Sequence, residues 1–147
     1  MKKTTVSVLL MCVLLLVACA KNVAPSTIEN VCQSEIGAMI SVEGYLLLPD
    51  FMDVSGNSKS ENSVYELFLA AQPEGKSEIV KTFVFGTGEN ETNHIAELPL
   101  DGYTQRDLQI FTDSGETVGS LDKVKITGEV LKRKNSCVLK IYKIEMP

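Results

Sequence analysis

The residues of this chain that could do chemistry are four cysteines, one histidine and nineteen carboxylates. A nucleophilic triad or dyad needs a base beside a serine or cysteine, and His94 is the single histidine, with no recognisable nucleophile motif in the chain. We expect His94 to lie in a solvated loop. Two carboxylates could meet in a cleft for glycoside hydrolysis, but so acidic a chain produces close carboxylate pairs without catalytic meaning. The sequence therefore predicts a protein that is not an enzyme.

Oxygen ligands suitable for calcium also occur in pairs within loops. The pairs are Asp50 with Asp53, Glu89 with Glu91, and Asp113 with Glu116. No twelve-residue EF-hand pattern accompanies them, so we expect no metal and no cofactor. Gly86-Thr87-Gly88 follows a strand as a phosphate-binding loop would, but it lacks a further glycine and a Gly-Lys-Ser/Thr sequence. It therefore predicts a turn.

Leu16-Val17-Ala18-Cys19 closes an apolar run that begins after Lys2-Lys3. A charged start, an apolar stretch too short to span a bilayer, and a small residue before a cysteine are the parts of a secretory signal. Because all four positions match, the segment resembles the lipobox of bacterial lipoproteins. That resemblance implies cleavage before Cys19, a diacylglycerol thioether on its sulfur, and an acylated amino terminus, which carries palmitate or a similar chain. An ordinary signal peptide with a chance cysteine is the alternative.

The same resemblance implies a protein anchored by lipid on the outer side of a membrane in the bacterial cell envelope. Ala20 follows the cysteine, where aspartate usually signals retention in the inner membrane of two-membrane bacteria. Sorting to the outer membrane is therefore permitted if the cell has one. We expect a signal peptide over residues 1–18, a lipidated tether over 19–27, and one folded domain over 28–147.

The charge of the chain restricts its partners. Without residues 1–18, the 147-residue chain keeps 129 residues with twelve bases and nineteen acids, a net charge of −7. That length suits one domain with a modest core. Residues 29–120 hold sixteen acids and four bases, whereas residues 121–147 hold seven bases and three acids. The overall acidity argues against general nucleic-acid binding.

Two cysteines remain once Cys12 leaves with the signal and Cys19 carries lipid. Cys32 and Cys137 are then a single pair outside the cytoplasm, and a disulfide between them is the natural interpretation. It would tie the start of the domain to its last strand. Two buried free thiols are the alternative; a redox or metal pair lacks a CxxC spacing or a further ligand.

The periodicity of apolar residues predicts an all-β domain. Thr27 offers an N-cap to one short helix with Ile28, Val31, Cys32 and Ile36 on its apolar face. Alternation with period two predicts several strands, separated by a polar loop over 50–63 and a turn over 73–76. The strands are expected at 39–48, 64–71, 79–85, 108–112, 123–130 and 137–145, with a possible helical turn over 93–98.

Gly44 and Gly128 sit on the core face of long strands, where a missing side chain permits the sharp coiling of a small barrel. From Ile36 to Glu145 the chain resembles an OB-fold domain of the kind found in envelope lipoproteins and anticodon-binding-like modules. The patterns that carry the resemblance are Ser41-Val42-Glu43-Gly44-Tyr45-Leu46 and the last two strands, 121–130 and 137–145. We therefore expect a small five- to six-stranded OB-like Greek-key barrel with one or two short helices. Residues 86–119 are longer than the usual link between the third and fourth strands.

The resemblance implies a ligand face on strands two and three and the neighbouring loops. Stacking or apolar contact there would come from aromatic residues, and a cationic rim from the last turn. The expected ligand-binding residues are Tyr45, Phe68, Phe85, Lys132, Arg133 and Lys134. Our first hypothesis is a non-enzymatic, membrane-anchored module that binds a protein, peptide or glycan partner. The alternatives are an extracytoplasmic oligonucleotide binder and a structural lipoprotein without a specific ligand.

Overall fold

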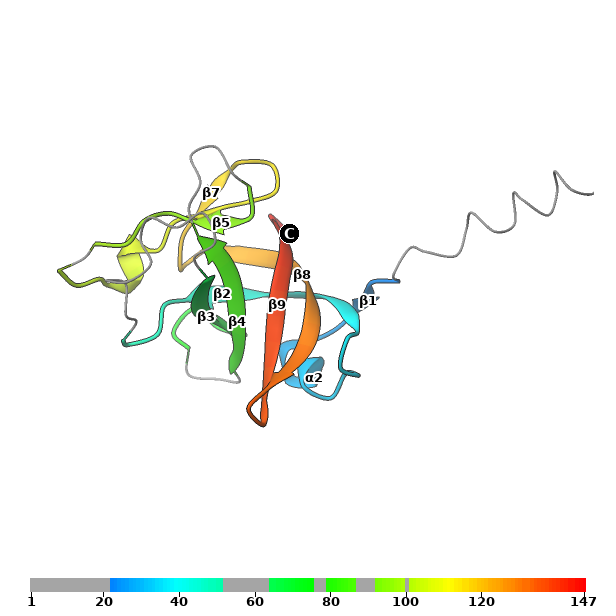
Figure 1. Cartoon of the computed structure of the whole chain (residues 1–147). Helices are drawn as coiled ribbons and strands as arrows, with labels where there is room; N and C mark the ends of the chain where they lie inside the picture. The colour runs from blue at the N-terminus through cyan, green and yellow to red at the C-terminus, as the bar shows by residue number, and fades with distance from the viewer. Residues whose placement is uncertain (1–21, 52–63, 76–78, 87–91, 100) are drawn as a thin grey trace, which may run out of the picture.

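The computed structural model describes residues 22–51, 64–75, 79–86, 92–99 and 101–147. Five long strands form a closed barrel, with a short helix and a chain of small strands attached to it (Figure 1). The five are β2 (Met39–Leu47), β3 (Val64–Ala70), β4 (Ile79–Gly86), β8 (Lys123–Arg133) and β9 (Ser136–Glu145). The prediction of an all-β, OB-like barrel is therefore confirmed.

The strand pairing closes the barrel in the order β2, β3, β4, β9, β8 and back to β2. Four of these five pairings are antiparallel, and β4 with β9 is parallel. β2 is shared, because its first part pairs with β8 and its last three residues pair with β3. Full closure leaves the five barrel strands without a free edge between them.

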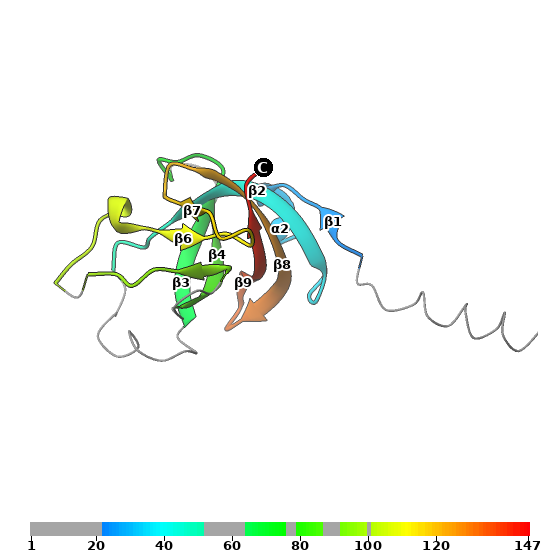
Figure 2. The same ribbon diagram turned by 90° about the horizontal axis from the view of Figure 1, so that it is seen from above.

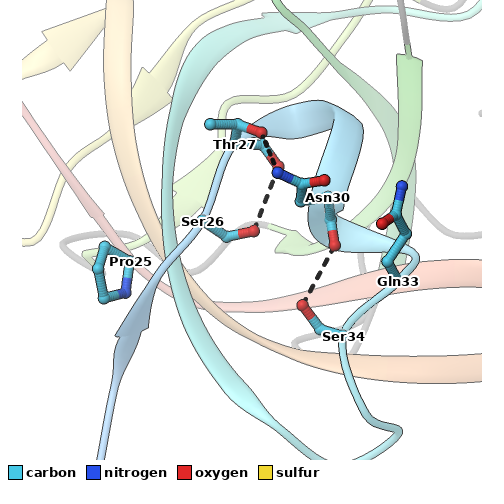
Figure 3. A pocket seen from close by; sticks show the side chains of 6 residues that line it. All are labelled: Pro25, Ser26, Thr27, Asn30, Gln33 and Ser34. Carbon is cyan, nitrogen blue, oxygen red and sulfur yellow. Dashed lines mark hydrogen bonds between the residues drawn. The ribbon is translucent and has the colours of Figure 1, made fainter.

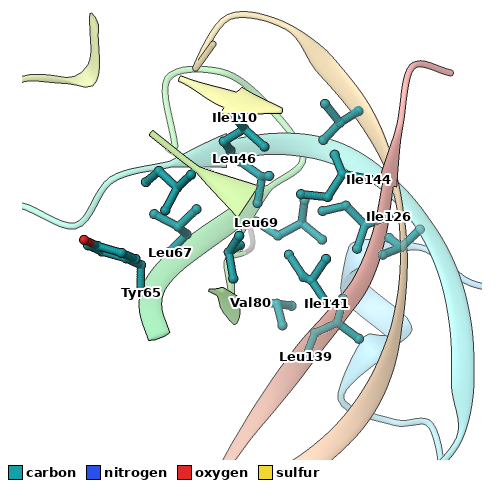
Figure 4. Close-up of a cluster of buried hydrophobic side chains, with 14 of the residues drawn as sticks. Leu46, Tyr65, Leu67, Leu69, Val80, Ile110, Ile126, Leu139, Ile141 and Ile144 are labelled. Atoms are coloured by element: carbon teal, nitrogen blue, oxygen red, sulfur yellow. The ribbon is translucent and has the colours of Figure 1, made fainter. Parts of the chain in front are cut away.

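Alternating apolar side chains fill the interior of the barrel (Figure 4). On β8 the residues Val124, Ile126 and Val130 are buried, while those between them lie outward or half-exposed. Gly128 continues that inner row, and a Cβ at this position would lie 2.6 Å from the carbonyl oxygen of Lys140. Gly44 is equally confined, with the Ala70 carbonyl oxygen 2.7 Å from an added Cβ. Both glycines therefore face the core, as predicted, at close approaches of two strands.

The helix α2 (Ile28–Val31) begins after Thr27, as predicted, and buries both Ile28 and Val31 in the core. Immediately after it, Cys32 forms a disulfide with Cys137 at the start of β9, so that expectation is confirmed too. The two Cα atoms are 5.6 Å apart and 105 residues separate them in the sequence. Such a long closed loop restricts the unfolded chain strongly.

A two-residue strand precedes the helix. β1 (Ala24–Pro25) pairs in parallel with Ile40 and Ser41 of β2, and the Ser26 backbone N–H donates to the Ser41 carbonyl at 2.8 Å. Part of the segment expected as a tether is thus attached to the barrel.

The connection between β4 and β8 holds three more short strands and one turn of 3-10 helix (Figure 2). The three strands extend the sheet outward from β4. The first of them pairs with β4 in parallel, and each later strand pairs antiparallel with the one before it. The elements are β5 (His94–Ile95), η2 (Gln105–Asp107), β6 (Ile110–Phe111) and β7 (Thr117–Val118). The expected strand over 108–112 is therefore present but shorter.

Side chains fasten this connection to the barrel. The Gln105 amide bonds both backbone groups of Leu48, donating to its carbonyl at 2.6 Å and accepting from its N–H at 2.9 Å. The Tyr103 hydroxyl donates to the Pro49 carbonyl at 2.9 Å. At the other end, the Ile144 N–H donates to the Asn93 side-chain oxygen at 2.6 Å.

The predicted helical turn over 93–98 is wrong. Asn93 has a φ of 60°, outside the right-handed helical region, and His94 and Ile95 pair with β4 and β6. The expectation of a solvated His94 is also wrong. Its side chain is 6% exposed, stacks on Phe111 with ring centroids 4.6 Å apart, and leaves Nδ1 without a hydrogen-bond partner.

Ile36 was expected on the apolar face of the helix but is 66% exposed. The helix ends at Val31, and Gly37 at a φ of +86° then turns the chain into β2. The expected loop over 50–63 and the Thr87-Gly88 part of the expected turn lie mainly or wholly outside the described residues, as does the signal segment 1–18. Within the described ranges, no helix is long and apolar enough to cross a membrane.

Candidate functional site

A transverse row of side chains crosses the outer surface of the barrel. Strand register aligns Leu47 of β2 with Phe68 of β3, Phe68 with Lys81 of β4, Lys81 with Val138 of β9, and Val138 with Leu131 of β8. The inner row of β3 is buried, whereas Phe68 is half-buried on the opposite face. Cross-strand partners share a face of the sheet, so the five side chains lie on one face. Leu47 and Val138 are buried there, and Phe68, Lys81 and Leu131 are the members that reach the surface.

A cavity of about 300 Å³ opens beside the middle of this row. It is bounded by β3, β4, β9 and the tip of the β8–β9 hairpin. The lining residues are Glu66, Lys81, Arg133, Lys134, Ser136 and Val138. Lys134 and Asn135 form the two-residue turn between β8 and β9, with φ values of 49° and 71°. This tight turn places Lys134 at the edge of the cavity.

The lining of this cavity is cationic in a chain that is acidic overall. Its described lining residues include three basic side chains and one carboxylate, a formal charge of +2 against −5 for the whole chain. Lys81 and Glu66 form an ion pair at 2.7 Å, which neutralises the one acid. Arg133 and Lys134 are the other two basic residues of the lining, and Val138 is its apolar member. An arginine and a lysine around a small cavity suit a carboxylate, sulfate or phosphate group.

The structure brings some of the predicted ligand residues together and separates others. Arg133 and Lys134 line the cavity, and Phe68 is the cross-strand neighbour of Lys81. Tyr45 is half-buried on β2, paired with Ala70 and so diagonal to Phe68. Phe85 lies on β4 opposite Val64, and its side chain is outside the part of the chain that the structure describes.

Lys132 does not join the other two cations. It lines a second cavity, of about 450 Å³, on the other side of the hairpin. The Cys32–Cys137 disulfide and the exposed Ile36 also border this second cavity. The expected cationic rim of three residues is thus divided between two surfaces, because successive residues of a strand point to opposite sides.

A third cavity, of about 470 Å³, lies beside α2 and is lined by small polar residues (Figure 3). Asn30 donates to the Thr27 hydroxyl at 3.0 Å, and the Ser34 hydroxyl donates to the Asn30 carbonyl at 3.2 Å. Its lining is Pro25, Ser26, Thr27, Asn30, Gln33 and Ser34. Among the described residues, its lining includes no charged and no aromatic side chain, so it offers weaker recognition chemistry than the cationic cavity.

Ion pairs outside the cationic cavity shift the pKa values of their members. The hydrogen bond that Lys123 donates to Glu43 at 2.8 Å lowers the pKa of Glu43 and raises that of Lys123. The hydrogen bond from Asn93 lowers the pKa of Asp113, and Lys143 lowers it further. These groups stabilise the connection and the β2–β8 pair rather than a ligand site.

The described residues contain no group of three histidine, cysteine or acidic side chains that could hold a metal ion. Sequence reasoning missed four lining residues: Glu66, Lys81, Ser136 and Val138. Alternation on β3 places Glu66 on the same face as Phe68, so that signal was available. The parallel pairing of β4 with β9, which brings Val138 beside Lys81, was not.

The fold and the cavity define the class as an OB-like barrel with a cationic patch on its outer strand surface. In comparisons with known proteins, no family model matches this chain, and none of the curated proteins matches it.

Proposed function

We propose that this chain is a non-enzymatic binding module of the bacterial envelope, anchored through lipid on Cys19, that binds an acidic protein, peptide or glycan segment on its outer barrel surface. The observation that carries the binding part is the cationic cavity lined by Arg133 and Lys134 in an otherwise acidic chain. The anchor rests on the Leu16-Val17-Ala18-Cys19 pattern.

The arrangement of the cavity supports a chain-like ligand rather than a small free ion. Phe68 is the cross-strand neighbour of Lys81, so a segment that places an acidic group in the cavity could also place an apolar group or a sugar ring on Phe68. The acidic surface elsewhere would repel such a ligand and so favour this one place for it. Half-exposed Phe68 supplies apolar contact or stacking on a sugar ring.

Arg133→Glu should weaken binding at least about tenfold, because a charge-assisted hydrogen bond is replaced by repulsion. The measurement is a titration of the detergent-solubilised lipoprotein with a polyglutamate peptide, polygalacturonate and single-stranded DNA in parallel. Arg106→Glu is the matched control, since Arg106 is the other arginine of the chain and lies in η2, outside the cavity lining.

Equal weakening by both variants would contradict the assignment of the cavity, and so would no binding of any of the three probes. Binding of single-stranded DNA alone, with an affinity that falls steeply with salt, would favour the oligonucleotide alternative. The position of Phe68 beside the cationic cavity is the observation that supports this alternative.

A further inference from the structure

One end of the barrel combines exposed apolar side chains with a lysine and the start of the described chain. Val23 is 46% exposed directly before β1, and Ile36 is 66% exposed three residues before β2 begins. β1 runs parallel to β2 with Ala24 beside Ile40, so both residues lie at the first end of β2. Ile36, Glu35 and Lys132 line the same cavity, so one exposed carboxylate and one exposed lysine lie near the exposed isoleucine.

The tether fixes how far this end can lie from an anchored Cys19. β1 is bonded to β2 through Ala24 and Pro25, so only the residues between Cys19 and Ala24 can span the gap. The five Cα–Cα steps from Cys19 to Ala24 cover at most about 18 Å when fully extended. An anchor on Cys19 would therefore hold the β1 end close to the lipid surface and allow the opposite end to project away.

Resting on the proposed lipid anchor, we infer that the β1 end of the barrel is a membrane-contacting surface, with Val23 and Ile36 entering the headgroup region and Lys132 binding anionic phospholipids. Exposed apolar side chains can enter the headgroup region of a bilayer, and a lysine beside them is attracted to anionic lipids. The disulfide beside Ile36 holds this surface rigidly to the barrel.

The opposite end provides a matched control. Leu121 is 78% exposed and precedes β8, whose first residue, Lys123, pairs with Tyr45. Tyr45 is six residues along β2 from Met39, which is about 20 Å for an extended strand. An exposed leucine and an exposed isoleucine thus mark the two ends of the same barrel.

The experiment places an environment-sensitive fluorescent amino acid at position 36 or at position 121 of the full lipoprotein, which avoids a new thiol near the disulfide. Each variant is reconstituted into vesicles of phosphatidylcholine and phosphatidylglycerol that carry a headgroup-quencher lipid. We expect strong quenching at position 36 and little at position 121. Lys132→Glu should lower the ratio of membrane-contacting to free orientations about fivefold or more, since each cation near an anionic surface contributes about that factor. Lys125→Glu, on the distal part of β8, should leave the ratio unchanged.

Equal quenching at both positions, or none at position 36, would overturn the inference. An intact mass of the purified protein and its flotation with vesicles distinguish the causes. A lipidated protein that floats but is not quenched at position 36 refutes this surface and leaves the anchor standing. A Cys19 without lipid refutes the anchor and this inference together. A position-36 probe shielded by envelope proteins but not by vesicles would assign this end to a protein partner instead.

Discussion

The closed barrel and the connection between β4 and β8 are held in place by different interactions. The five barrel strands are seven to eleven residues long and pair through continuous ladders around a shared apolar interior. In the connection each of the three strands has two residues, and single side chains such as Gln105 and Asn93 bond it to barrel backbone. The barrel is therefore stabilised by many repeated contacts, whereas the connection depends on a few specific ones.

The largest expected effect of a single change lies in the barrel. Leu139→Ala removes a fully buried side chain at the centre of the core and should lower the free energy of unfolding by about 2–5 kcal/mol. Urea denaturation followed by circular dichroism measures it. Leu131→Ala, which truncates a half-exposed leucine on the adjacent strand, is the control and should cost much less. Similar losses in both variants would mean that the interior is not tightly packed.

An intermediate and more local effect is expected in the connection. Asn93→Gly permits the same positive φ but removes the side-chain bonds to Ile144 and Asp113, so it should cost about 1–3 kcal/mol. Hydrogen exchange should become faster in β5, β6 and β7 and stay slow in β2 and β8. Asn93→Ala adds the strain of a positive φ and should be worse than Asn93→Gly. Uniformly faster exchange over the whole molecule would show that the two regions unfold as one unit.

The smallest effect concerns pH. Because the pKa of Asp113 is lowered in the folded protein, chiefly by the hydrogen bond from Asn93, its carboxylate stabilises the fold above the ordinary pKa of about 3.9. That stabilisation is lost as the pH falls through the lowered pKa. The stability difference between the wild type and Asp113→Asn should therefore shrink on acidification below about pH 4. A difference that stays constant or grows in acid would contradict this role of Asp113.

The same contrast explains what the sequence could predict. Period-two alternation in residues such as Val124 and Ile126 is dictated by burial of one face, so it predicts the barrel strands and both core glycines correctly. The disulfide is predicted separately, from the number of cysteines that remain after the signal and the lipid site. The connection depends on individual partners far apart in the sequence, such as Gln105 with Leu48, and no local pattern encodes them. His94 looked like a loop residue for that reason, although Phe111 covers its ring.

The candidate site was predictable only in part. Arg133, Lys134 and Phe68 were identified from charge and residue type, and the register places them around one surface. The separation of Lys132 from Arg133 follows from strand alternation, which the run of three bases obscured. Val138 joins the cavity through the parallel pairing of β4 with β9, and that pairing exists only in the closed barrel.

The most direct test of the central claim is cross-linking of the native lipoprotein in cells, followed by purification and mass spectrometry. Wild type is compared with the double variant Phe68→Ala, Arg133→Glu and with the control Arg106→Glu. The account predicts one enriched acidic protein or glycan partner that is lost in the double variant and kept in the control. The same neighbours in all three samples, or none in any, would contradict a binding role for the cationic cavity.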